Sequence, residues 1–376
     1  MKILFITHYD NMYGANMALY KLIKGLRLEG GHEVMLVIPA RGQMTEALEE
    51  IGVKCIISSV TQWQAVYAGG FRFFIKKLIR RRKIRRELNY LYGLLRNEHI
   101  DLIHSNSSVI GTGAMLSKRL KCRHVWHIRE FSKEHFGMRY FYGMNYVKGL
   151  YESASALITI SDSLCNNYKA KYNGANILRV YDGVDGEDSW TNGMLADGKI
   201  HFGIVGYLFD KKHQMDVIEA SSKLVAMGIT NFMVHIIGDG FITYKQKLMD
   251  AIDDHNMQAY VEMKGYIPNV HETLNDMNVG ILASEYEGFG LVTLEYMLHG
   301  MPVIGRNSGA TPELIEATKA GLLFDDVDAL AKAMKQLIND RELCIELGRR
   351  GRENAAHLFS EKENTANILD IYKTII

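Results

Sequence analysis

Short apolar runs alternate along the chain with longer segments in which apolar residues recur at helical spacing. Runs of Val, Ile and Leu without intervening polar residues are typical of parallel strands covered on both faces. Six such runs in the first half are expected to be strands: 2–8, 33–39, 53–57, 101–105, 124–128 and 156–160. Between them, the segments 15–28, 71–97 and 161–172 have the period of amphipathic helices. The pattern predicts a doubly wound α/β domain.

A second α/β series begins near residue 200. Its expected strands are 200–206, 231–238, 260–264, 279–283, 301–305 and 321–324. The preceding stretch, 182–199, is rich in turn residues and poor in apolar ones. We therefore expect a first domain over 1–185, a second over 186–358 and a C-terminal helix over 359–376 that follows the capping-box signature SEKE. Ligands of such folds bind at the carboxyl ends of strands.

Composition and charge narrow the class of protein. The 376 residues include 44 Lys+Arg and 43 Asp+Glu, a net charge of +1, which argues against a nucleic-acid binder because such domains carry a strong basic excess. The four cysteines lack metal-ligand spacing, as expected for reduced thiols in a cytoplasmic protein. We expect no signal peptide and no membrane-spanning helix.

The basic residues are unevenly distributed. The stretch 72–86 contains no acidic residue, and nine basic ones: Arg72, Lys76, Lys77, Arg80, Arg81, Arg82, Lys83, Arg85 and Arg86. On a helix, Phe71, Phe74, Ile75, Leu78 and Ile79 would fall near one face. We expect this cationic helix to contact an anionic membrane surface. The alternative is a solvated charged face whose apolar side packs on the sheet.

The first strand leads to a loop that contains Gly14. A dinucleotide site would require GxGxxG here, so NAD or FAD binding is disfavoured. Gly14 would let the backbone approach a ligand close to a helix N-terminus, where N–H groups favour phosphate. It could equally be an ordinary turn glycine.

The segment 283–295 combines a strand end, a glycine pair and a helix start. Gly288 and Gly290 permit a tight loop whose N–H groups can face an anion. Glu287 would lie in this loop and Glu295 on the helix, so that the two carboxylates could meet different parts of one ligand, and a carboxylate suits a ribose diol. The alternative is two solvated glutamates beside a surface turn.

These residues resemble the signature of the family 4 retaining glycosyltransferases (the group 1 glycosyltransferases), which have the GT-B fold. Glu287 and Glu295, with GFG after the first, match its two-glutamate motif. Further similarity is found in 126–130, 206–212, 238–240, 265–268, 300–304 and 309–315. The resemblance implies two Rossmann-like domains facing a central cleft, and a C-terminal helix that crosses back to the first domain.

The resemblance also implies residue roles. Lys212 would neutralise the donor diphosphate, Glu287 would contact the sugar hydroxyls, and Glu295 would hold the ribose. Other donor contacts would come from Gly14, Gly206, Gly238, Tyr266, Ile267, Phe289, Gly290 and Leu291. His127 would reach the transferred sugar and, with Lys212 and Glu287, form the catalytic set. Asn16, Asn106 and Arg129 would lie on the acceptor side.

Several positions leave alternatives open. A lone histidine after a buried strand, such as His127, is often a core residue, and Arg129 and Glu130 could form an internal pair. Tyr207 stands where the family usually has an arginine, so one positive charge is missing unless Lys211 or Arg306 supplies it. The first loop, YGAN, lacks the family's second glycine and acidic residue. The strand ends of the first domain show no Asp-x-Asp motif, and we expect no metal and no other cofactor.

The expected function is a metal-independent retaining glycosyltransferase (hexosyl or N-acetylhexosaminyl). It would move a sugar from a nucleotide-diphosphate sugar, in first place a UDP-sugar, to a lipid-linked or growing polysaccharide acceptor at the inner face of the plasma membrane. One alternative is a sugar-nucleotide 2-epimerase, which shares the architecture. Another alternative is a catalytically silent nucleotide-binding scaffold. The departure at Tyr207 is consistent with it, whereas the presence of Lys212, Glu287 and Glu295 argues against it.

Overall fold

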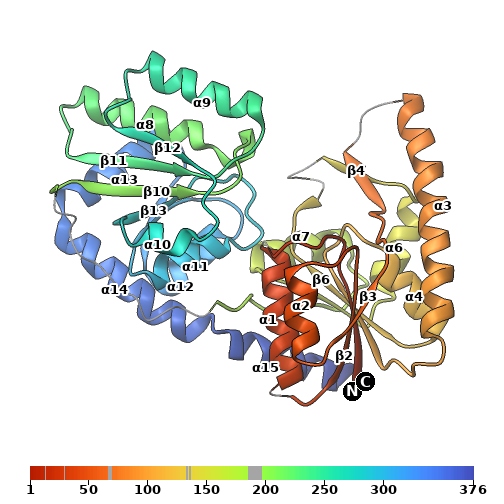
Figure 1. Ribbon diagram of the computed structural model, residues 1–376. Helices are drawn as coiled ribbons and strands as arrows, with labels where there is room; N and C mark the ends of the chain where they lie inside the picture. Colours follow the sequence, from red (N-terminus) through yellow and green to blue (C-terminus); the bar gives the residue numbers. More distant parts are fainter. Residues whose placement is uncertain (13, 29, 67–69, 133, 135–136, 185–196) are drawn as a thin grey trace. The chain divides into compact units, whose positions relative to one another are not determined.

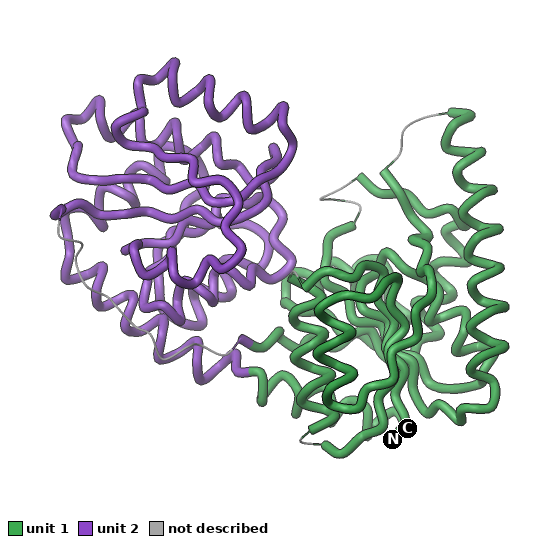
Figure 2. Tube along the Cα trace, in the orientation of Figure 1, with its two compact units in different colours: residues 1–183, 361–376 green, residues 184–360 purple. Residues whose placement is uncertain are grey.

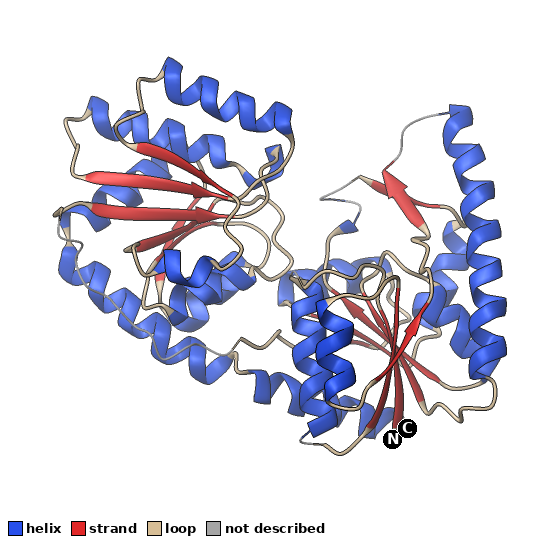
Figure 3. Ribbon diagram, viewed as in Figure 1, coloured by secondary structure: helices blue, strands red, loops and turns tan. Residues whose placement is uncertain are grey.

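The computed structural model describes residues 1–376 except 13, 29, 67–69, 133, 135–136 and 185–196. The chain divides into two compact units, Met1–Gly183 with Glu361–Ile376 and Val184–Ser360 (Figure 2). Each unit is a parallel β-sheet with helices on both faces (Figure 3). The expected domain boundary, between Asp185 and Gly186, lies outside the described residues, beside this division.

The sheet of unit 1 has seven strands in the order β3-β2-β1-β5-β6-β8-β9, and all neighbours are parallel. These strands are β1 (Lys2–Ile6), β2 (Glu33–Ile38), β3 (Lys54–Ile57), β5 (Leu102–Asn106), β6 (Arg123–Ile128), β8 (Ala156–Thr159) and β9 (Ile177–Arg179). The strand order reverses between β1 and β5, so their carboxyl ends form the switch point at which ligands bind in such folds.

The helices of unit 1 cover both faces of this sheet (Figure 1). They are α1 (Ala15–Leu28), α2 (Gln43–Glu50), α3 (Gly70–Leu95), α4 (Thr112–Leu120), α6 (Met144–Glu152), α7 (Asp162–Lys171) and α15 (Glu361–Ile375). The C-terminal helix α15 packs beside α1, with Ile368 and Tyr372 fully buried in the same core as Leu19 and Leu22. The C-terminal helix therefore belongs to the first unit, as the resemblance implied.

The sheet of unit 2 has six parallel strands in the order β12-β11-β10-β13-β14-β15, which reverses between β10 and β13. Its strands are β10 (Ile200–Val205), β11 (Phe232–Ile237), β12 (Val261–Gly265), β13 (Val279–Leu282), β14 (Val303–Arg306) and β15 (Gly321–Phe324). Its helices are η1 (Asp210–Lys212, a 3-10 turn), α8 (Gln214–Ala226), α9 (Ile242–Asp254), α10 (Val270–Leu274), α11 (Leu291–Leu298), α12 (Thr311–Thr318), α13 (Val327–Asn339) and α14 (Arg341–Leu358).

Three short strands were not predicted. β9 lies at the edge of the large sheet, and β4 (Gln64–Val66) pairs antiparallel with β7 (Met138–Tyr140). Each has three residues, too few for a strand period to show. The β4–β7 pairing also joins segments more than 70 residues apart, Gln64 with Tyr140, a non-local contact that local periodicity does not report.

Helix α3, which carries the basic stretch, has two different halves. Its second half packs on unit 1 through Ile84, Leu88, Leu91 and Leu95. Its first half exposes large apolar side chains, namely Phe71 (76%), Phe74 (53%), Ile75 (42%), Leu78 (45%) and Ile79 (60%). The second half also leaves Tyr90, Tyr92 and Leu94 exposed on its other side. Packing of the apolar side on the unit therefore describes only the second half. Among the helices that the structure describes, none is long and apolar enough to cross a bilayer.

Three histidines on β5 and β6 are buried in unit 1: His104, His124 and His127. His124 Nε2 lies 3.0 Å from the Ser105 hydroxyl, and His104 Nδ1 lies 2.5 Å from the Tyr372 hydroxyl. Burial lowers the pKa of all three, that of His124 to about 3. All three side chains are therefore neutral in the folded protein near pH 7.

We expect unit 1 to lose stability as the pH falls below about 6.5, the ordinary histidine pKa, because the unfolded chain then binds protons that the folded chain excludes. The loss is about 1.4 kcal/mol per pH unit for each histidine. Urea unfolding monitored across this range measures it. In a His124→Asn variant, the unfolding free energy should fall less steeply with pH, by the contribution of one histidine. An unchanged slope would contradict the inference that His124 is neutral in the folded protein.

Candidate active site

Two side chains that were predicted to be catalytic meet at the switch point of unit 2. Lys212 ends the η1 turn after β10, and Glu287 lies in the loop after β13, the neighbouring strand. Lys212 Nζ lies 2.8 Å from Glu287 Oε2, and the two side chains are 22% and 17% exposed. The reversal of strand order thus brings together residues 75 positions apart.

The loop after β14 holds Glu287 in place. The Ala310 N–H donates to the Glu287 carbonyl oxygen at 3.0 Å. Gly309 has φ +62°, and a Cβ added there would lie 2.7 Å from the backbone nitrogen and oxygen of Glu287. The Ser308 hydroxyl donates to the Glu285 carbonyl oxygen. The 309–315 segment that resembles the family therefore acts as a backbone clamp on the glutamate loop.

Helix α11 begins directly after this loop. Gly290, at its N-cap, has φ +85° and accepts a hydrogen bond from Thr293 N at 2.8 Å. The first N–H groups of a helix lack intrahelical partners and carry partial positive charge, so this helix start can bind an anion. Phe289 is buried and packs edge to face on Phe359. Glu295 is half-buried on the same helix.

The loops after β10, β11 and β12 form a continuous row. A Cβ on Gly238, where φ is +139°, would lie 2.0 Å from the Gly206 carbonyl oxygen, so this crossing requires glycine. Gly238 N donates to the Gly265 carbonyl oxygen at 2.8 Å. Tyr266, which follows, is exposed, and Ile267 is half-buried. The predicted donor residues of these loops therefore share one edge of the sheet.

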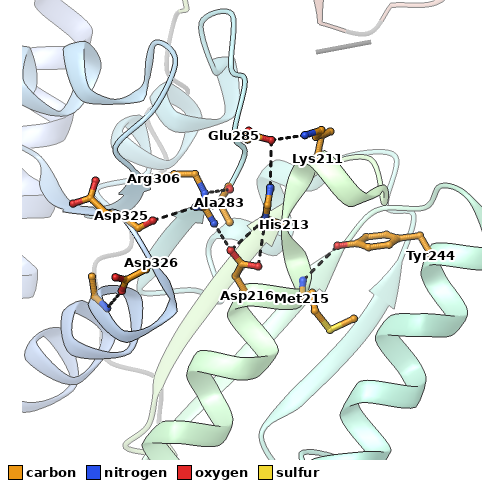
Figure 4. Close-up of polar contacts among 11 residues, drawn as sticks. Lys211, His213, Met215, Asp216, Tyr244, Ala283, Glu285, Arg306, Asp325 and Asp326 are labelled. Atoms are coloured by element: carbon orange, nitrogen blue, oxygen red, sulfur yellow. Dashed lines mark hydrogen bonds and ion pairs between the residues drawn. The ribbon is translucent and has the colours of Figure 1, made fainter. Parts of the chain in front are cut away.

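Arg306 at the end of β14 is engaged within unit 2 (Figure 4). Its Nε donates to the Ala283 carbonyl oxygen at 2.7 Å, and its guanidinium forms an ion pair with Asp216. It therefore does not supply the charge that is missing at Tyr207. Lys211 Nζ lies 2.6 Å from Glu285 Oε2, and this hydrogen bond raises the pKa of Lys211 and lowers that of Glu285.

Tyr207 occupies the position where the family usually has arginine. Its side chain is 52% exposed and its ring meets Phe241 edge to face, with centroids 5.5 Å apart. Its carbonyl oxygen accepts a hydrogen bond from Gln214 Nε2 at 3.2 Å. The substitution replaces a cation at this edge of the sheet by an aromatic surface.

In unit 1, Asn16 braces the loop between β1 and α1. The Thr7 hydroxyl donates to Asn16 Oδ1 at 2.7 Å, and Asn16 Nδ2 donates to the carbonyl oxygens of Tyr9 and Asn11, each at 2.8 Å. Asn16 is fully buried, so its polar atoms serve this loop. Gly14 in the same loop has φ +41°, with open space around the position of a Cβ.

The other predicted acceptor-side residues form an interior network. Arg129 is buried, its Nε donates to Asn106 Oδ1 at 2.7 Å, and its guanidinium pairs with Asp182. Asn106 Nδ2 donates to the Ala15 carbonyl oxygen at 3.2 Å. Asp182 was missed by the sequence reasoning, because it lies 53 positions from Arg129 in a stretch that reads as a turn. This network ties β5, β6 and the β1–α1 loop together.

Glu130 does not pair with Arg129, contrary to the internal pair considered from the sequence. Its carboxylate accepts hydrogen bonds from the Ser107 hydroxyl at 2.9 Å and from Ser108 N at 2.6 Å. It therefore fixes the loop after β5 and leaves Arg129 to Asp182 and Asn106.

His127 lies in the interior of unit 1 with no exposed surface. Its Nδ1 is 3.4 Å from Arg129 Nη2, and its ring meets His104 at a centroid distance of 5.2 Å. Burial first, and then the Arg129 charge, hold its pKa well below 6.5. A direct contact with a sugar would require this side chain to leave its present position.

No group of three or more His, Cys, Asp and Glu side chains within the described part of the chain is arranged to hold a metal ion.

Replacing Gly309 by alanine is expected to cost more stability than replacing Gly228. Both glycines have positive φ, which costs an alanine about 1–2 kcal/mol. Only Gly309 has a neighbour, the Glu287 backbone, within 4 Å of the added Cβ, and such overpacking adds about 1–3 kcal/mol. Chemical unfolding of the two variants measures the difference, and equal losses would argue against the clamp.

Both halves of the chain match known glycosyltransferase families. Residues 12–188 match glycosyltransferase family 4, and residues 192–354 match the glycosyl transferases group 1. Together the two matched segments span most of the chain.

Two curated relatives illustrate the similarity. A poly(ribitol-phosphate) alpha-N-acetylglucosaminyltransferase of Staphylococcus aureus is 31% identical over 160 residues, 42% of this chain and 31% of the relative. An N-acetyl-alpha-D-glucosaminyl L-malate synthase of Bacillus anthracis is 27% identical over 239 residues, 60% of this chain and 61% of the relative. The matched segments thus span about a third and about three fifths of these relatives.

The fold is also found in a solved structure. Anabaena HepE, crystallised in complex with UDP, superposes with a TM-score of 0.78 over the whole of both chains at 18% identity. Given the two family matches and this fold, the chain belongs to the group 1 glycosyltransferases of glycosyltransferase family 4 and has the GT-B fold.

Proposed function

We propose that the protein is a retaining glycosyltransferase that moves a hexose-type sugar from a nucleotide-diphosphate sugar to a lipid-linked or growing polysaccharide acceptor. The observation that carries the proposal is the Lys212–Glu287 pair at the switch point of unit 2, in the loops beside the N-terminus of α11. A cation and helix N–H groups suit the diphosphate of a nucleotide sugar, and a carboxylate suits its sugar hydroxyls.

A UDP-sugar is the first donor to test, because the HepE protein was crystallised with UDP. Both curated relatives are named as N-acetylglucosaminyl enzymes, which makes UDP-N-acetylglucosamine the first sugar nucleotide of a panel. In this proposal Glu295 holds the ribose, Tyr266 and Ile267 border the base, and Phe289, Gly290 and Leu291 offer N–H groups to the phosphates. Gly206 and Gly238 let the backbone approach them.

The mechanism follows from the leaving group. Cleavage of the bond between the sugar and the diphosphate builds negative charge on the phosphate and positive character on the sugar ring. In this proposal, Lys212 and the N–H groups at the start of α11 stabilise this charge, and preorganised electrostatic stabilisation of this kind usually contributes more to catalysis than any other effect. Glu287 orients the sugar through its hydroxyls. The departing phosphate accepts the proton of the acceptor hydroxyl, and the acceptor oxygen bonds to the anomeric carbon on the face that the phosphate leaves. The anomeric configuration is thereby retained, and the step requires no metal.

Unit 1 serves the acceptor in this proposal. The three residues predicted for the acceptor side, Asn16, Asn106 and Arg129, position the loops of unit 1 through the contacts described above. Gly14, predicted as a donor contact, is exposed in the loop between β1 and α1. A role for His127 at the transferred sugar depends on a rearrangement that brings it out of the core.

A Lys212→Ala variant is expected to lower kcat about 100- to 1000-fold, the usual effect of removing one donor that stabilises developing charge. Glu295→Gln should lower kcat/KM for the donor about 10- to 100-fold, because a charge-assisted bond is worth about 1.5–3 kcal/mol. Nucleotide release from a panel of UDP- and GDP-sugars measures both. Lys223→Ala is the matched control, since Lys223 pairs with Asp328 at the surface of unit 2.

The products separate this proposal from the alternatives. A glycoside with retained configuration supports it, whereas a free sugar isomer would identify a 2-epimerase. Nucleotide binding without turnover in the presence of acceptor would identify a silent scaffold. No thermal shift with any donor, or a Glu295→Gln variant with normal rates, would contradict the donor site.

We also propose that the protein works at the cytoplasmic face of the plasma membrane, with the first half of α3 in contact with anionic lipids. Exposed apolar side chains from Phe71 to Ile79 lie among the nine basic residues of this helix. Binding at a membrane interface is strengthened both by apolar side chains that enter it and by cations that attract its surface charge.

Replacing Lys76, Lys77, Arg80 and Lys83 by glutamine is expected to weaken binding to anionic vesicles about fivefold per charge, since each basic residue near the surface contributes about 1 kcal/mol. Vesicle flotation at low and high salt measures the effect. The same replacement of four exposed lysines away from α3 is the control: Lys169, Lys247, Lys332 and Lys335. Equal binding by the wild type and the α3 variant would refute the contact.

A further inference from the structure

A pocket of about 350 Å³ opens on unit 1, lined by residues of α3, of the end of α4 and of the start of α6. Figure 1 shows these three helices on one side of the large sheet. Four arginines and two tyrosines give the pocket its polar lining: Arg81, Arg82, Arg85, Arg119, Tyr142 and Tyr146. The volume lies at the lower end of the range of small-molecule sites, about 300–1,000 Å³.

The arginines of this pocket have no acidic partner within the described part of the chain. Among the described residues, no carboxylate forms an ion pair with any of the four guanidinium groups. Arg119 Nη1 donates to the uncharged Asn89 Oδ1 at 2.8 Å, and Arg81 lies over the Tyr142 ring at 5.0 Å. Clustered arginines without a counter-charge repel one another. An anion bound among them is attracted by each of the guanidinium groups.

The acidic residue of α3, Glu87, is not among the residues that line the pocket. Glu87 is buried, and its carboxylate accepts hydrogen bonds from Thr61 N at 2.9 Å and from the Ser59 hydroxyl at 2.8 Å. Glu87 thus makes its hydrogen bonds within unit 1 and forms no ion pair with the pocket arginines.

The walls of the pocket suit a phosphate group. A guanidinium offers two parallel N–H donors to two phosphate oxygens. Tyr142 and Tyr146 stack at a centroid distance of 5.2 Å, which gives a rigid border. Helix α6 begins at Met144, between these tyrosines in sequence, and a helix start adds partial positive charge.

The surroundings indicate that the phosphate is carried on a lipid. Leu78 lines the pocket and is 45% exposed, and three further exposed apolar residues, Phe71, Phe74 and Ile75, lie between it and the start of α3. We propose that this arginine–tyrosine pocket binds the headgroup phosphate of an anionic phospholipid while the first half of α3 lies in the bilayer interface. The inference rests on the membrane contact proposed above and names its ligand chemistry.

The helix offers matched variants that separate a pocket from general charge attraction. Arg82→Gln/Arg85→Gln removes two charges from the pocket, and Arg80→Gln/Arg86→Gln removes two charges from the same helix outside it. On α4, Arg119→Gln and Lys118→Gln form a second matched pair. Arg119→Lys keeps the charge and removes the guanidinium fork. Melting curves check that each variant is folded.

Co-sedimentation with phosphatidylcholine vesicles that contain phosphatidylglycerol is the measurement. The outside pair should weaken binding about fivefold per charge. The pocket pair should weaken it about tenfold more, because a hydrogen bond to a charged group is also lost. Arg119→Gln should likewise weaken vesicle binding more than Lys118→Gln, and the loss caused by Arg119→Lys should lie between the two. Equal losses in the matched pairs would overturn the proposal in favour of charge attraction alone.

A second arm identifies the source of the phosphate. Glycerol phosphate and inorganic phosphate are added as competitors, and we expect them to displace the protein from vesicles only weakly. Displacement at low concentration, lost in the pocket variants, would show a site for soluble phosphate and overturn the lipid assignment. Because no sugar nucleotide is present, a failed donor panel leaves this result standing, and equal losses here leave the donor site standing.

Discussion

In the two large sheets all neighbouring strands run parallel, so the loops that leave their carboxyl ends emerge along one edge. The strand order reverses once in each sheet, and at that point the two adjacent loops diverge and leave room for side chains. In unit 2 this constraint places Lys212 and Glu287 within 2.8 Å of each other. The arrangement of the proposed donor site follows from the sheet before any side-chain chemistry is considered.

Backbone contacts too tight for side chains then fix the site. Gly238 touches the Gly206 carbonyl, and Gly309 touches the Glu287 backbone, so an alanine at either glycine would displace a loop that carries proposed donor residues. The glutamate loop is held by its main chain, which leaves its carboxylates for ion pairs and ligands. Arg306 also holds the start of this loop, because it binds the Ala283 carbonyl oxygen and Asp216 (Figure 4).

The net charge of +1 hides an uneven distribution whose meaning depends on pairing. Around the switch point of unit 2, Lys211, Lys212 and Arg306 each have a carboxylate partner. On α3 and the end of α4, the arginines of the pocket have none among the described residues. The paired charges of unit 2 stabilise loop geometry, whereas the arginines of the pocket provide a surface for an anion.

The sequence by itself determined the two α/β series, most of their strands and the two-glutamate motif, because apolar periodicity and glycine placement act over neighbouring residues. It also located the basic stretch. Only the tertiary structure decided which half of α3 packs on unit 1, that α15 packs on α1, that Arg129 pairs with Asp182, and that His127 is buried. These outcomes depend on contacts between residues far apart in the chain, and burial at one position depends on what packs against it, which no local pattern contains.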